Sequence, residues 1–450
     1  MYLKRDKFLI VGISKSGYSS CKLLLSKGAE CYIYDKEQSV KVKKYIDELT
    51  NCGAKLVNGE NIEDVISLCD TIVLSPGIPI DNSIPVSARR QKKNIIGELE
   101  LGGYFTSGPL IAITGTNGKT TTSYLTEYIL QSSGLKCYTA GNIGIPLCDV
   151  CCKKTEEEIG IIEVSSFQLE TVARFTPHVA CILNITPDHL SRHYNMDNYV
   201  YLKSRILRNL RESEYAVLNA DAAKIVEFSM NTRAKIVFFS MTKVVDGAYV
   251  KDGKVYWKGE FLFDVDSISL KGGHNIQNVL ASVCICKIFG VEKSIIRDRI
   301  SDFKGVKHRL QEVAEINGVK YINDSKSTNP DSTKAAVRSF TGETILLIGG
   351  KYKQEGYKEL FIEIKDKVKE IILYGENRKQ LYDYALEEGV NKVSVIENFV
   401  NAVRFASIIA QGGDTVLLSP ACSSFDEFSC FEERGERFIE IVKQMGTLDT

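Results

Sequence analysis

The first part of the chain alternates short apolar runs with stretches of helical spacing. Residues 8–11, 31–34 and 71–74 are rich in β-branched and aromatic side chains, and stretches long enough for a helix separate them. An order in which each strand is followed by a crossover is typical of a parallel sheet covered by helices. The pattern predicts a Rossmann-like α/β domain over residues 1–97.

The same rhythm returns twice further along the chain. Glycines and Pro109 interrupt the pattern near residues 102–109, and a helix at 120–132 is predicted from Tyr124, Leu125, Tyr128 and Ile129 at helical spacing. A third segment begins after about residue 303, and no fixed-period repeat is evident. The strands predicted in these two segments are 110–113, 160–164, 179–183, 320–322, 344–348, 370–374 and 415–418.

These patterns predict an α/β fold of three domains, with boundaries at residues 97/98 and 303/304. A length of 450 residues agrees, because it exceeds what one hydrophobic core usually serves. The third domain, residues 304–450, is expected to be Rossmann-like, as is the first. Apolar residues make up 44% of the chain and charged residues 25%, a globular composition without long disorder.

The net charge and the cysteine spacing exclude several classes of partner and of stabilising framework. The 57 basic and 57 acidic residues cancel, so no overall charge attracts nucleic acid or an anionic membrane, and we expect neither as a partner. The thirteen cysteines are scattered without zinc-site spacing, which argues against a metal or disulfide framework. The first apolar run is too short for a signal peptide or a membrane span, so we expect a cytoplasmic protein with reduced thiols.

A glycine-rich loop follows the strand predicted at 110–113 and precedes the helix at 120–132. Glycines let the backbone wrap round an anion, the helix N-terminus offers unpaired N–H groups, Lys119 adds a charge, and Thr120 can ligate magnesium. The loop is shorter than the standard motif, since Ile113 occupies the first glycine position. It predicts a P-loop-type mononucleotide-binding domain over residues 98–303, and the alternative is an ordinary turn. The predicted ATP loop is Gly115, Thr116, Asn117, Gly118, Lys119, Thr120 and Thr121.

A weaker phosphate-site signal lies at the end of the first strand. The segment from Gly12 to Gly17 resembles a dinucleotide fingerprint, and Asp35 closes the second strand where such units place a ribose-reading acid. The fingerprint is incomplete because Ser14 stands where its second glycine belongs. The segment therefore predicts a nucleotide-like phosphate site without requiring NAD, and a tight turn is the alternative.

Two further strand ends carry candidate metal and base residues. Glu163 closes one apolar strand, while Asp188 and His189 follow another, at the carboxyl edge where open α/β sheets bind ligands. Magnesium prefers oxygen ligands and water, and a buried acid without a partner would be costly. For Glu163 the alternative is a helix cap, and for His189 it is a packed loop residue.

Taken in order, these motifs resemble the Mur ligases, ATP-dependent enzymes of peptidoglycan synthesis that share three domains and the TGTNGKT loop. Segments 323–329 and 418–428 are most similar to the members that add D-glutamate to UDP-N-acetylmuramoyl-L-alanine. The other matching segments are 141–144, 163–170, 184–189, 273–278 and 308–309.

The resemblance implies four groups of site residues. Contacts to the UDP precursor are expected from Ser14, Lys15, Ser16, Gly17, Asp35, Gly77, Asn142 and Ser165. Besides the loop, ATP contacts are expected from Asn275, Asn278, Arg309 and Asp324. D-Glutamate contacts are expected from Lys326, Thr328, Lys353, Ser424 and Phe431, with Lys351 as the alternative to Lys353. Magnesium is expected at Thr120, Glu163 and His189, with a second site through a carbamylated Lys203.

The same resemblance implies the activity, in which ATP converts the alanyl carboxylate to an acyl phosphate that the amine of D-glutamate attacks. Lys119, His189, Lys203 and Arg309 are the expected catalytic residues. The substrates are small molecules, and we expect a monomer. The alternatives are another Mur ligase, a folylpolyglutamate synthase, or a nucleotide-binding regulator without ligase activity.

Overall fold

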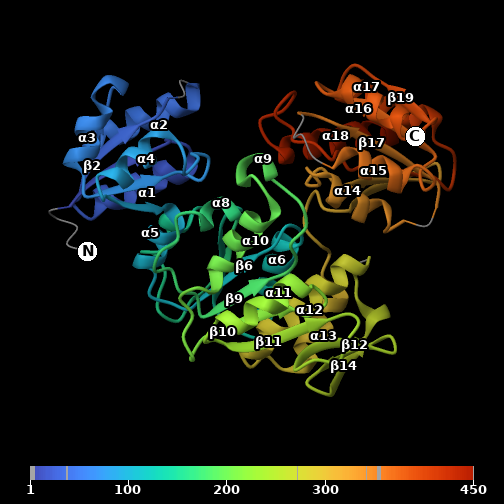
Figure 1. The fold of residues 1–450 in the computed structure, drawn as a ribbon. Coiled ribbons are helices and arrows are strands. Elements are labelled where there is room, and N and C mark those ends of the chain that lie inside the picture. Colours follow the sequence, from blue (N-terminus) through green and yellow to red (C-terminus); the bar gives the residue numbers. More distant parts are fainter. Residues whose placement is uncertain (1–5, 37–38, 271, 341, 352–355, 449–450) are drawn as a thin grey trace. The chain divides into compact units, whose positions relative to one another are not determined.

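The computed structural model describes residues 6–36, 39–270, 272–340, 342–351 and 356–448 (Figure 1). Within these residues the strands form three sheets, of five, nine and six strands. Helices cover the sheets, which confirms the predicted α/β fold of three domains. In the described residues no helix is long and apolar enough to span a membrane.

The first sheet is parallel throughout and has the order β3-β2-β1-β4-β5. Its strand order reverses at β1, which lies between β2 and β4, and ligands bind at the carboxyl ends of strands beside such a switch point. Its elements are β1 (Lys7–Val11), α1 (Lys15–Ser26), β2 (Glu30–Tyr34), α2 (Val40–Asn51), β3 (Lys55–Leu56), α3 (Ile62–Leu68), β4 (Thr71–Leu74), α4 (Ser83–Arg90) and β5 (Asn94–Gly97).

The second sheet has the order β14-β13-β12-β11-β10-β9-β6-β8-β7, and only β12, β13 and β14 pair antiparallel. Its strands are β6 (Leu110–Thr114), β7 (Cys137–Gly141), β8 (Ile159–Glu163), β9 (Val179–Ile182), β10 (Tyr215–Asn219), β11 (Lys235–Ser240), β12 (Gly247–Lys251), β13 (Lys254–Trp257) and β14 (Glu260–Asp264). The helices of this part of the chain are α5 (Glu98–Phe105), α6 (Lys119–Ser132), α7 (Leu147–Val150), α8 (Ser166–Leu169), α9 (Leu190–His193), α10 (Met196–Ser204), α11 (Ala223–Glu227), α12 (Gly273–Ile288) and α13 (Lys293–Asp302).

The third sheet has the order β15-β16-β20-β17-β18-β19, with the antiparallel hairpin β15–β16 at one edge. One apolar cluster lies between the sheet and α14, α15 and α16, and a second lies between the sheet and α17 and α18. The elements are β15 (Gln311–Ile316), β16 (Val319–Asn323), α14 (Pro330–Val337), β17 (Thr344–Gly349), α15 (Tyr357–Ile364), β18 (Glu370–Tyr374), α16 (Arg378–Glu387), β19 (Val393–Val395), α17 (Phe399–Ile409), β20 (Thr415–Leu418) and α18 (Phe431–Leu448).

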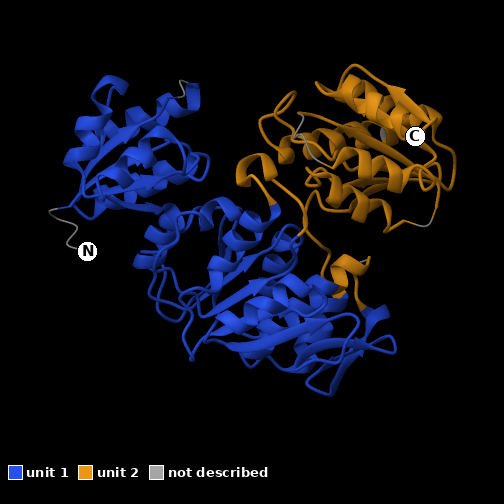
Figure 2. Cartoon of the chain, in the orientation of Figure 1, with its two compact units in different colours: residues 1–185, 196–267, 277–301 blue, residues 186–195, 268–276, 302–450 orange. Residues whose placement is uncertain are grey.

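The chain divides into two compact units (Figure 2). Unit 1 comprises residues 1–185, 196–267 and 277–301, and unit 2 comprises residues 186–195, 268–276 and 302–450. Residues 186–195 of the loop that leaves β9 therefore belong to unit 2, although β9 and the first residues of the loop belong to unit 1. The predicted boundaries at 97/98 and 303/304 stay a prediction.

Every strand predicted from the sequence is present, and 71–74, 370–374 and 415–418 have the predicted bounds. The helix predicted at 120–132 is confirmed as α6, although not every apolar residue that predicted it is buried. Leu125 and Ile129 are fully buried, but Tyr124 is 37% exposed. The buried face is completed by small polar residues instead, because Thr126 donates a hydrogen bond to Ser282 of α12 at 3.2 Å.

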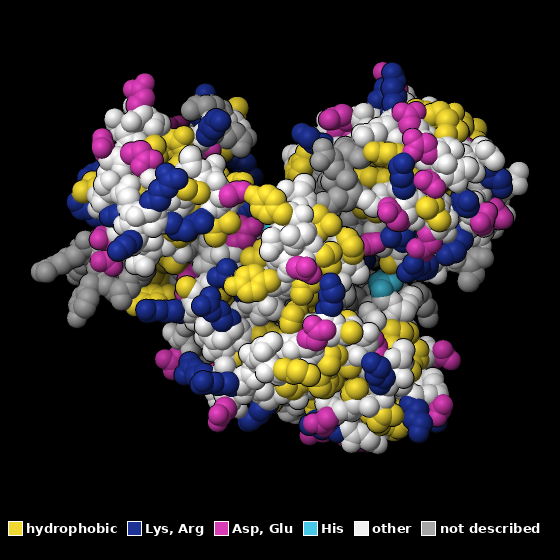
Figure 3. All heavy atoms as spheres, in the orientation of Figure 1, with side chains coloured by type: hydrophobic (Ala, Val, Ile, Leu, Met, Phe, Trp, Pro, Cys, Tyr) yellow, Lys and Arg dark blue, Asp and Glu magenta, His cyan; other side chains and the backbone are white. Residues whose placement is uncertain are grey.

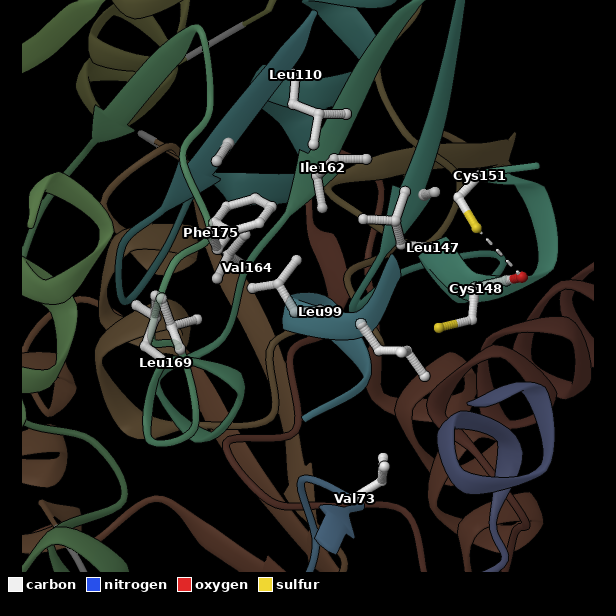
Figure 4. Packing of buried hydrophobic residues seen from close by; sticks show 14 of the residues in the cluster. Val73, Leu99, Leu110, Leu147, Cys148, Cys151, Ile162, Val164, Leu169 and Phe175 are labelled. Atoms are coloured by element: carbon white, nitrogen blue, oxygen red, sulfur yellow. Dashed lines mark hydrogen bonds between the residues drawn. The ribbon is translucent and has the colours of Figure 1, made fainter. Parts of the chain in front are cut away.

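A continuous apolar cluster connects α5 with the sheet that follows it. Figure 4 shows Leu99 of α5 beside Leu147 and Val164, with Leu110 and Ile162 further along the sheet. On the face in Figure 3, basic and acidic side chains are interspersed over both units, so the balance of charge seen in the sequence extends to this surface.

The first residue of α5 is a buried acid within this apolar surrounding. Glu98 is 2% exposed, and its Oε1 accepts a 2.7 Å hydrogen bond from the backbone N–H of Cys148. Its Oε2 is buried with no hydrogen-bond partner. Burial raises the pKa of Glu98 to about 7, against the smaller opposing effect of the hydrogen bond from Cys148.

We expect Glu98 to make the protein less stable as the pH rises. Below about pH 4.5 both states hold the proton; between about 4.5 and 7 only the folded state keeps it, so the free energy of unfolding falls by about 3 kcal/mol. Glu98→Gln should remove this fall in the free energy of unfolding between pH 5 and pH 8, as measured by urea unfolding. The exposed Glu156→Gln is the control and should keep the wild-type difference between the two pH values. If Glu98→Gln also keeps this difference, the assignment is contradicted.

Candidate active site

The predicted phosphate loop joins β6 to the first turn of α6. Gly118 has a φ of 87°, a conformation that favours glycine, and a Cβ there would come within 2.1 Å of Oδ1 of Asn278 and displace this side chain. The side chain of Asn184, just beyond β9, accepts a hydrogen bond from Asn117 N at 2.9 Å and donates one to Asn117 O at 3.0 Å. The loop is thus fixed at the N-terminus of a 14-residue helix, the geometry of an anion site.

Two lysine ammonium groups meet at one carbonyl of this loop. Nζ of Lys119 donates to Gly115 O and to Thr116 O, each at 2.9 Å, and Nζ of Lys203 donates to Gly115 O at 2.8 Å. Lys203 is 1% exposed, and its ammonium lies 4.7 Å from the ring centroid of Tyr199. Two positive charges at a helix N-terminus favour a multiply charged anion such as a polyphosphate.

Glu163 lies at the end of β8, next to the phosphate loop, and is 2% exposed. Its Oε2 accepts a hydrogen bond from the hydroxyl of Thr120 at 2.7 Å, and its Oε1 accepts one from Nδ2 of Asn142 at 2.9 Å. The helix-cap alternative for Glu163 is wrong, because Ser165 caps α8 in a reciprocal capping box with Gln168. The buried acid is therefore held by side chains at the predicted nucleotide site.

A hydroxyl and a carboxylate in contact fit the ligand preferences of magnesium. Mg²⁺ takes one or two carboxylates and completes its shell with water and substrate phosphates. Among the described residues there is no group of three or more His, Cys, Asp or Glu that could form an all-protein metal cage. Thr120 and Glu163 thus suit a metal that is bound together with a phosphate.

The predicted residues His189 and Asp188 lie in the part of the loop that belongs to unit 2. His189 has a φ of 55°, which is uncommon for a residue with a side chain, and it stands at the start of α9. Its Nε2 is 3.5 Å from Oδ2 of Asp188, and the same Oδ2 accepts a hydrogen bond from Nδ2 of Asn329 at 3.3 Å. The ring of His189 is therefore oriented by a carboxylate that a third residue holds.

Arg309 and Asp324 form an ion pair in unit 2. A guanidinium nitrogen of Arg309 is 3.6 Å from Oδ1 of Asp324 and donates to the hydroxyl of Ser327 at 2.7 Å. Asp324 is fully buried and accepts from Ser419 at 2.8 Å; burial raises its pKa, and the charge of Arg309 opposes this shift. Burial, and then the charge of Arg309, lowers the pKa of His274 to about 3, so this imidazole is neutral at pH 7.

The predicted precursor residues of the first sheet surround the turn after β1. Asp35 accepts a hydrogen bond from the backbone N–H of Ile13, so it shapes this turn. A Cβ at Gly17 would lie 1.9 Å from Gly12 O, and this position therefore requires glycine. Nζ of Lys15 donates to Gly144 O. Ser14 and Gly77 lie beside the same strand ends, at the switch point of the sheet.

The predicted acceptor residues lie in the loops after β16 and β20 and at the start of α18. The ammonium of Lys326 is 4.7 Å from the ring centroid of Phe431, and Ser424 is 2% exposed. Thr328 is half-buried, and Lys353 lies outside the described residues. Lys351, the alternative to Lys353, donates from its backbone N–H to Ser423 O at 2.8 Å.

Arg434 joins these segments, and no sequence pattern pointed to it. It is fully buried and donates to the backbone carbonyls of Ser325, Cys422 and Gly349, at 3.0, 3.2 and 3.4 Å. One arginine in an amphipathic helix leaves no pattern that distinguishes it from a surface residue. Asn184 lies in the matching segment 184–189, but no role was predicted for it. Its hydrogen bonds to the phosphate loop are evident only from the structure.

The structure brings some of the predicted residues together and separates others. Unit 1 contains the phosphate loop, Glu163, Asn142, Lys203 and Asn278, whereas unit 2 contains Asn275 together with the remaining ATP residues and the acceptor residues. The two asparagines predicted to contact ATP, Asn275 and Asn278, therefore belong to different units. Asn142 and Ser165, predicted for the precursor, contact Glu163 and Gln168 in this structure.

Comparisons with known proteins agree along the whole chain. Residues 6–97 match the Mur ligase MurD-like N-terminal domain, residues 113–286 the Mur ligase middle domain, and residues 308–422 the Mur ligase glutamate ligase domain. The UDP-N-acetylmuramoylalanine–D-glutamate ligase of Caldanaerobacter subterraneus subsp. tengcongensis is 38% identical over 448 residues, covering 99% of this chain and 100% of that protein. The ligase of the same name from Clostridioides difficile is 38% identical over 452 residues, with coverage of 99% and 100%.

Solved structures share the fold at lower identity. UDP-N-acetylmuramate-alanine ligase MurC of Thermotoga maritima has a TM-score of 0.62 and 18% identity over 98% of this chain and 100% of that chain. The MurF ligase of the same organism, solved in complex with ADP, has a TM-score of 0.63 and 16% identity, with coverage of 99% and 100%. With three matching domains in order and full-length relatives at this identity, the chain belongs to the Mur ligase family.

Proposed function

We propose that this chain is an ATP-dependent ligase that adds D-glutamate to UDP-N-acetylmuramoyl-L-alanine, a step of peptidoglycan precursor synthesis. The observation that carries the proposal is the arrangement around Gly115, where two lysines and a helix N-terminus lie beside the Thr120–Glu163 pair. The full-length relatives support the choice of D-glutamate, because they are named for this reaction. We also propose a monomer that works in the cytoplasm.

The terminal phosphates of ATP would lie at the phosphate loop. The helix N-terminus, Lys119 and Arg309 would offset their negative charge, which is the dominant effect in phosphoryl transfer. Thr120, Glu163 and His189 would hold magnesium, which lowers the cost of charge on the phosphate oxygens. Asn275, Asn278 and Asp324 would complete the ATP site.

Lys203 would supply a second metal ligand after it reacts with carbon dioxide. The neutral amine adds to CO2 to form a carbamate and releases one proton, which turns a cation into an oxygen ligand. Its burial beside Lys119 supports this proposal, since two ammonium groups share one carbonyl oxygen there and a carbamate would replace one of them with oxygen ligands.

The reaction would proceed in two displacements. An oxygen of the alanyl carboxylate attacks the γ-phosphorus of ATP, and ADP leaves; the amine of D-glutamate then attacks the acyl carbon, and phosphate leaves with the carboxylate oxygen. Thr328, Lys326, Lys353, Ser424 and Phe431 would bind D-glutamate. Asn142 and Ser165, with the turn after β1, would bind the precursor.

A panel of substrates tests the proposal. With UDP-N-acetylmuramoyl-L-alanine, ATP and magnesium, phosphate release should require D-glutamate and should not occur with L-glutamate or L-lysine. Folate with L-glutamate should give no phosphate, which separates the proposal from a folylpolyglutamate synthase. Tight ATP binding with no acceptor-dependent ADP formation would identify a regulator instead.

A further inference from the structure

Asn329 uses the two ends of one side-chain amide for different contacts. Its Oδ1 accepts a 2.8 Å hydrogen bond from the backbone N–H of Ser332 and so caps the N-terminus of α14. Its Nδ2 donates a 3.3 Å hydrogen bond to Oδ2 of Asp188. A helix cap needs only the oxygen, so the nitrogen contact is a separate feature.

The nitrogen contact connects two segments to which the proposed reaction gives different tasks. Asp188 precedes His189, whose Nε2 lies 3.5 Å from the same Oδ2, and His189 is proposed to bind metal. On the other side, Asn329 follows Thr328, which is proposed to bind the amino acid. The loop 186–195 leaves β9 of unit 1 but belongs to unit 2, as the short orange helix in Figure 2 shows.

We propose that Asn329 is a positioning residue that holds Asp188, and through it His189, on the unit that binds the amino acid. Acceptor binding at Thr328 fixes the backbone next to this amide, so a bound acceptor stabilises the orientation of His189. Metal binding and acceptor binding are thereby coupled. This inference rests on the proposed function, but the contact itself can be tested without catalysis.

Two substitutions separate the contact from the helix cap. Asn329→Ser and Asn329→Asp both keep an oxygen that caps α14, since Ser, Asp and Asn are similarly good caps. Asn329→Asp removes the amide donor and sets a carboxylate against Asp188, whereas Asn329→Ser leaves a hydroxyl on a shorter side chain as the only possible donor. We expect Asn329→Asp to lower kcat/KM for D-glutamate about ten-fold or more, as for a lost hydrogen bond to a charged group, and Asn329→Ser to have a smaller effect.

A second readout is the magnesium concentration for half-maximal rate, which should rise in Asn329→Asp. A purely structural role of Asn329 would leave this concentration unchanged. Asn398 provides a matched control, because its Oδ1 caps α17 of the same unit through Asn401 N at 3.0 Å. Asn398→Asp should leave both the magnesium requirement and kcat/KM unchanged. If Asn329→Asp and Asn398→Asp change the magnesium requirement and kcat/KM equally, the inference is overturned.

An exchange of the two partners gives the strictest test. In the double variant Asp188→Asn/Asn329→Asp, the new amide at 188 can donate to the new carboxylate at 329, which still caps α14. Compared with Asn329→Asp alone, the double variant should regain part of kcat/KM, because the hydrogen bond between positions 188 and 329 is restored while the carboxylate beside Nε2 of His189 is not. If the loss of kcat/KM in the double variant equals the product of the losses in Asp188→Asn and Asn329→Asp, the coupling is contradicted.

Hydrogen exchange of the peptide covering 186–195 decides the contact independently of activity. Exchange should be faster in Asn329→Asp than in wild type or Asn398→Asp, and slow again in the double variant. Unchanged exchange in Asn329→Asp would overturn the inference. A wild-type protein that is inactive with D-glutamate, yet shows this exchange pattern, would instead refute the proposed function.

Discussion

Replacing Lys119 with alanine is expected to lower the rate of ADP formation at least about a thousand-fold, because a positive charge aimed at the transferring phosphoryl group is lost. In the structure the ammonium lies 2.9 Å from two loop carbonyls, so it is already held where a terminal phosphate would bind. Single-turnover ADP formation, with UDP-N-acetylmuramoyl-L-alanine present, measures this step directly.

The exposed Lys136 of the same unit is the matched control. Lys136→Ala should keep the wild-type rate, and both variants should melt within a few degrees of wild type, since neither side chain contributes to an apolar core. A Lys119→Ala protein that forms ADP within about three-fold of the wild-type rate would contradict the assignment of the phosphate site.

Glu163→Gln is expected to lower activity about a hundred-fold or more while leaving the fold intact, because it removes the carboxylate charge proposed to hold magnesium. The amide oxygen of the new side chain can still accept from Asn142, and its nitrogen can donate to the hydroxyl of Thr120. The magnesium concentration for half-maximal rate and the melting temperature together separate a metal defect from a folding defect.

Glu158 directly precedes β8, the strand that Glu163 ends, and offers a control for Glu163→Gln. It is bonded to Lys154 and Thr155 and lies outside the predicted site. Glu158→Gln should not change the magnesium requirement. If Glu163→Gln keeps near-normal activity at low magnesium, the metal role of Glu163 is wrong.

The phosphate loop could be predicted from the sequence because each of its requirements is local. Strand, glycines, lysine and helix follow one another within residues 110–132, and no distant contact is needed to recognise them. Several parallel strands were predictable for the same reason, since apolar runs such as 71–74 and 415–418 are buried on both faces. Other parallel strands were not predicted, among them β5, β7, β10, β11 and β19.

The antiparallel strands β12, β13 and β14 were missed although the sequence carries their signal. Asp252 and Gly253, with φ of 50° and 70°, form the turn between β12 and β13, and Asp-Gly is the preferred pair for a two-residue hairpin turn. Lys258 and Gly259 have φ of 48° and 88° between β13 and β14. A search for hairpin turns would have found this edge of the sheet.

The contacts that hold the site together could not be predicted, because the residues that make them are distant in sequence. Asn278 contacts Gly118 from 160 positions away, and Arg434 reaches carbonyls of three separate segments of the chain. The exposure of Tyr124 has a similar origin, since packing against α12 sets which face of α6 is buried. Such contacts depend on the three-dimensional arrangement and leave no local periodicity.

Transfer of a carboxylate oxygen to phosphate is the most direct test of the proposed reaction. UDP-N-acetylmuramoyl-L-alanine with 18O in both carboxylate oxygens is incubated with ATP, magnesium, D-glutamate and the enzyme, and the released phosphate is analysed by mass spectrometry. An acyl phosphate predicts that each phosphate carries one 18O atom from the substrate. Phosphate without 18O, formed together with the amide product, would show that the carboxylate is not phosphorylated and would contradict the account.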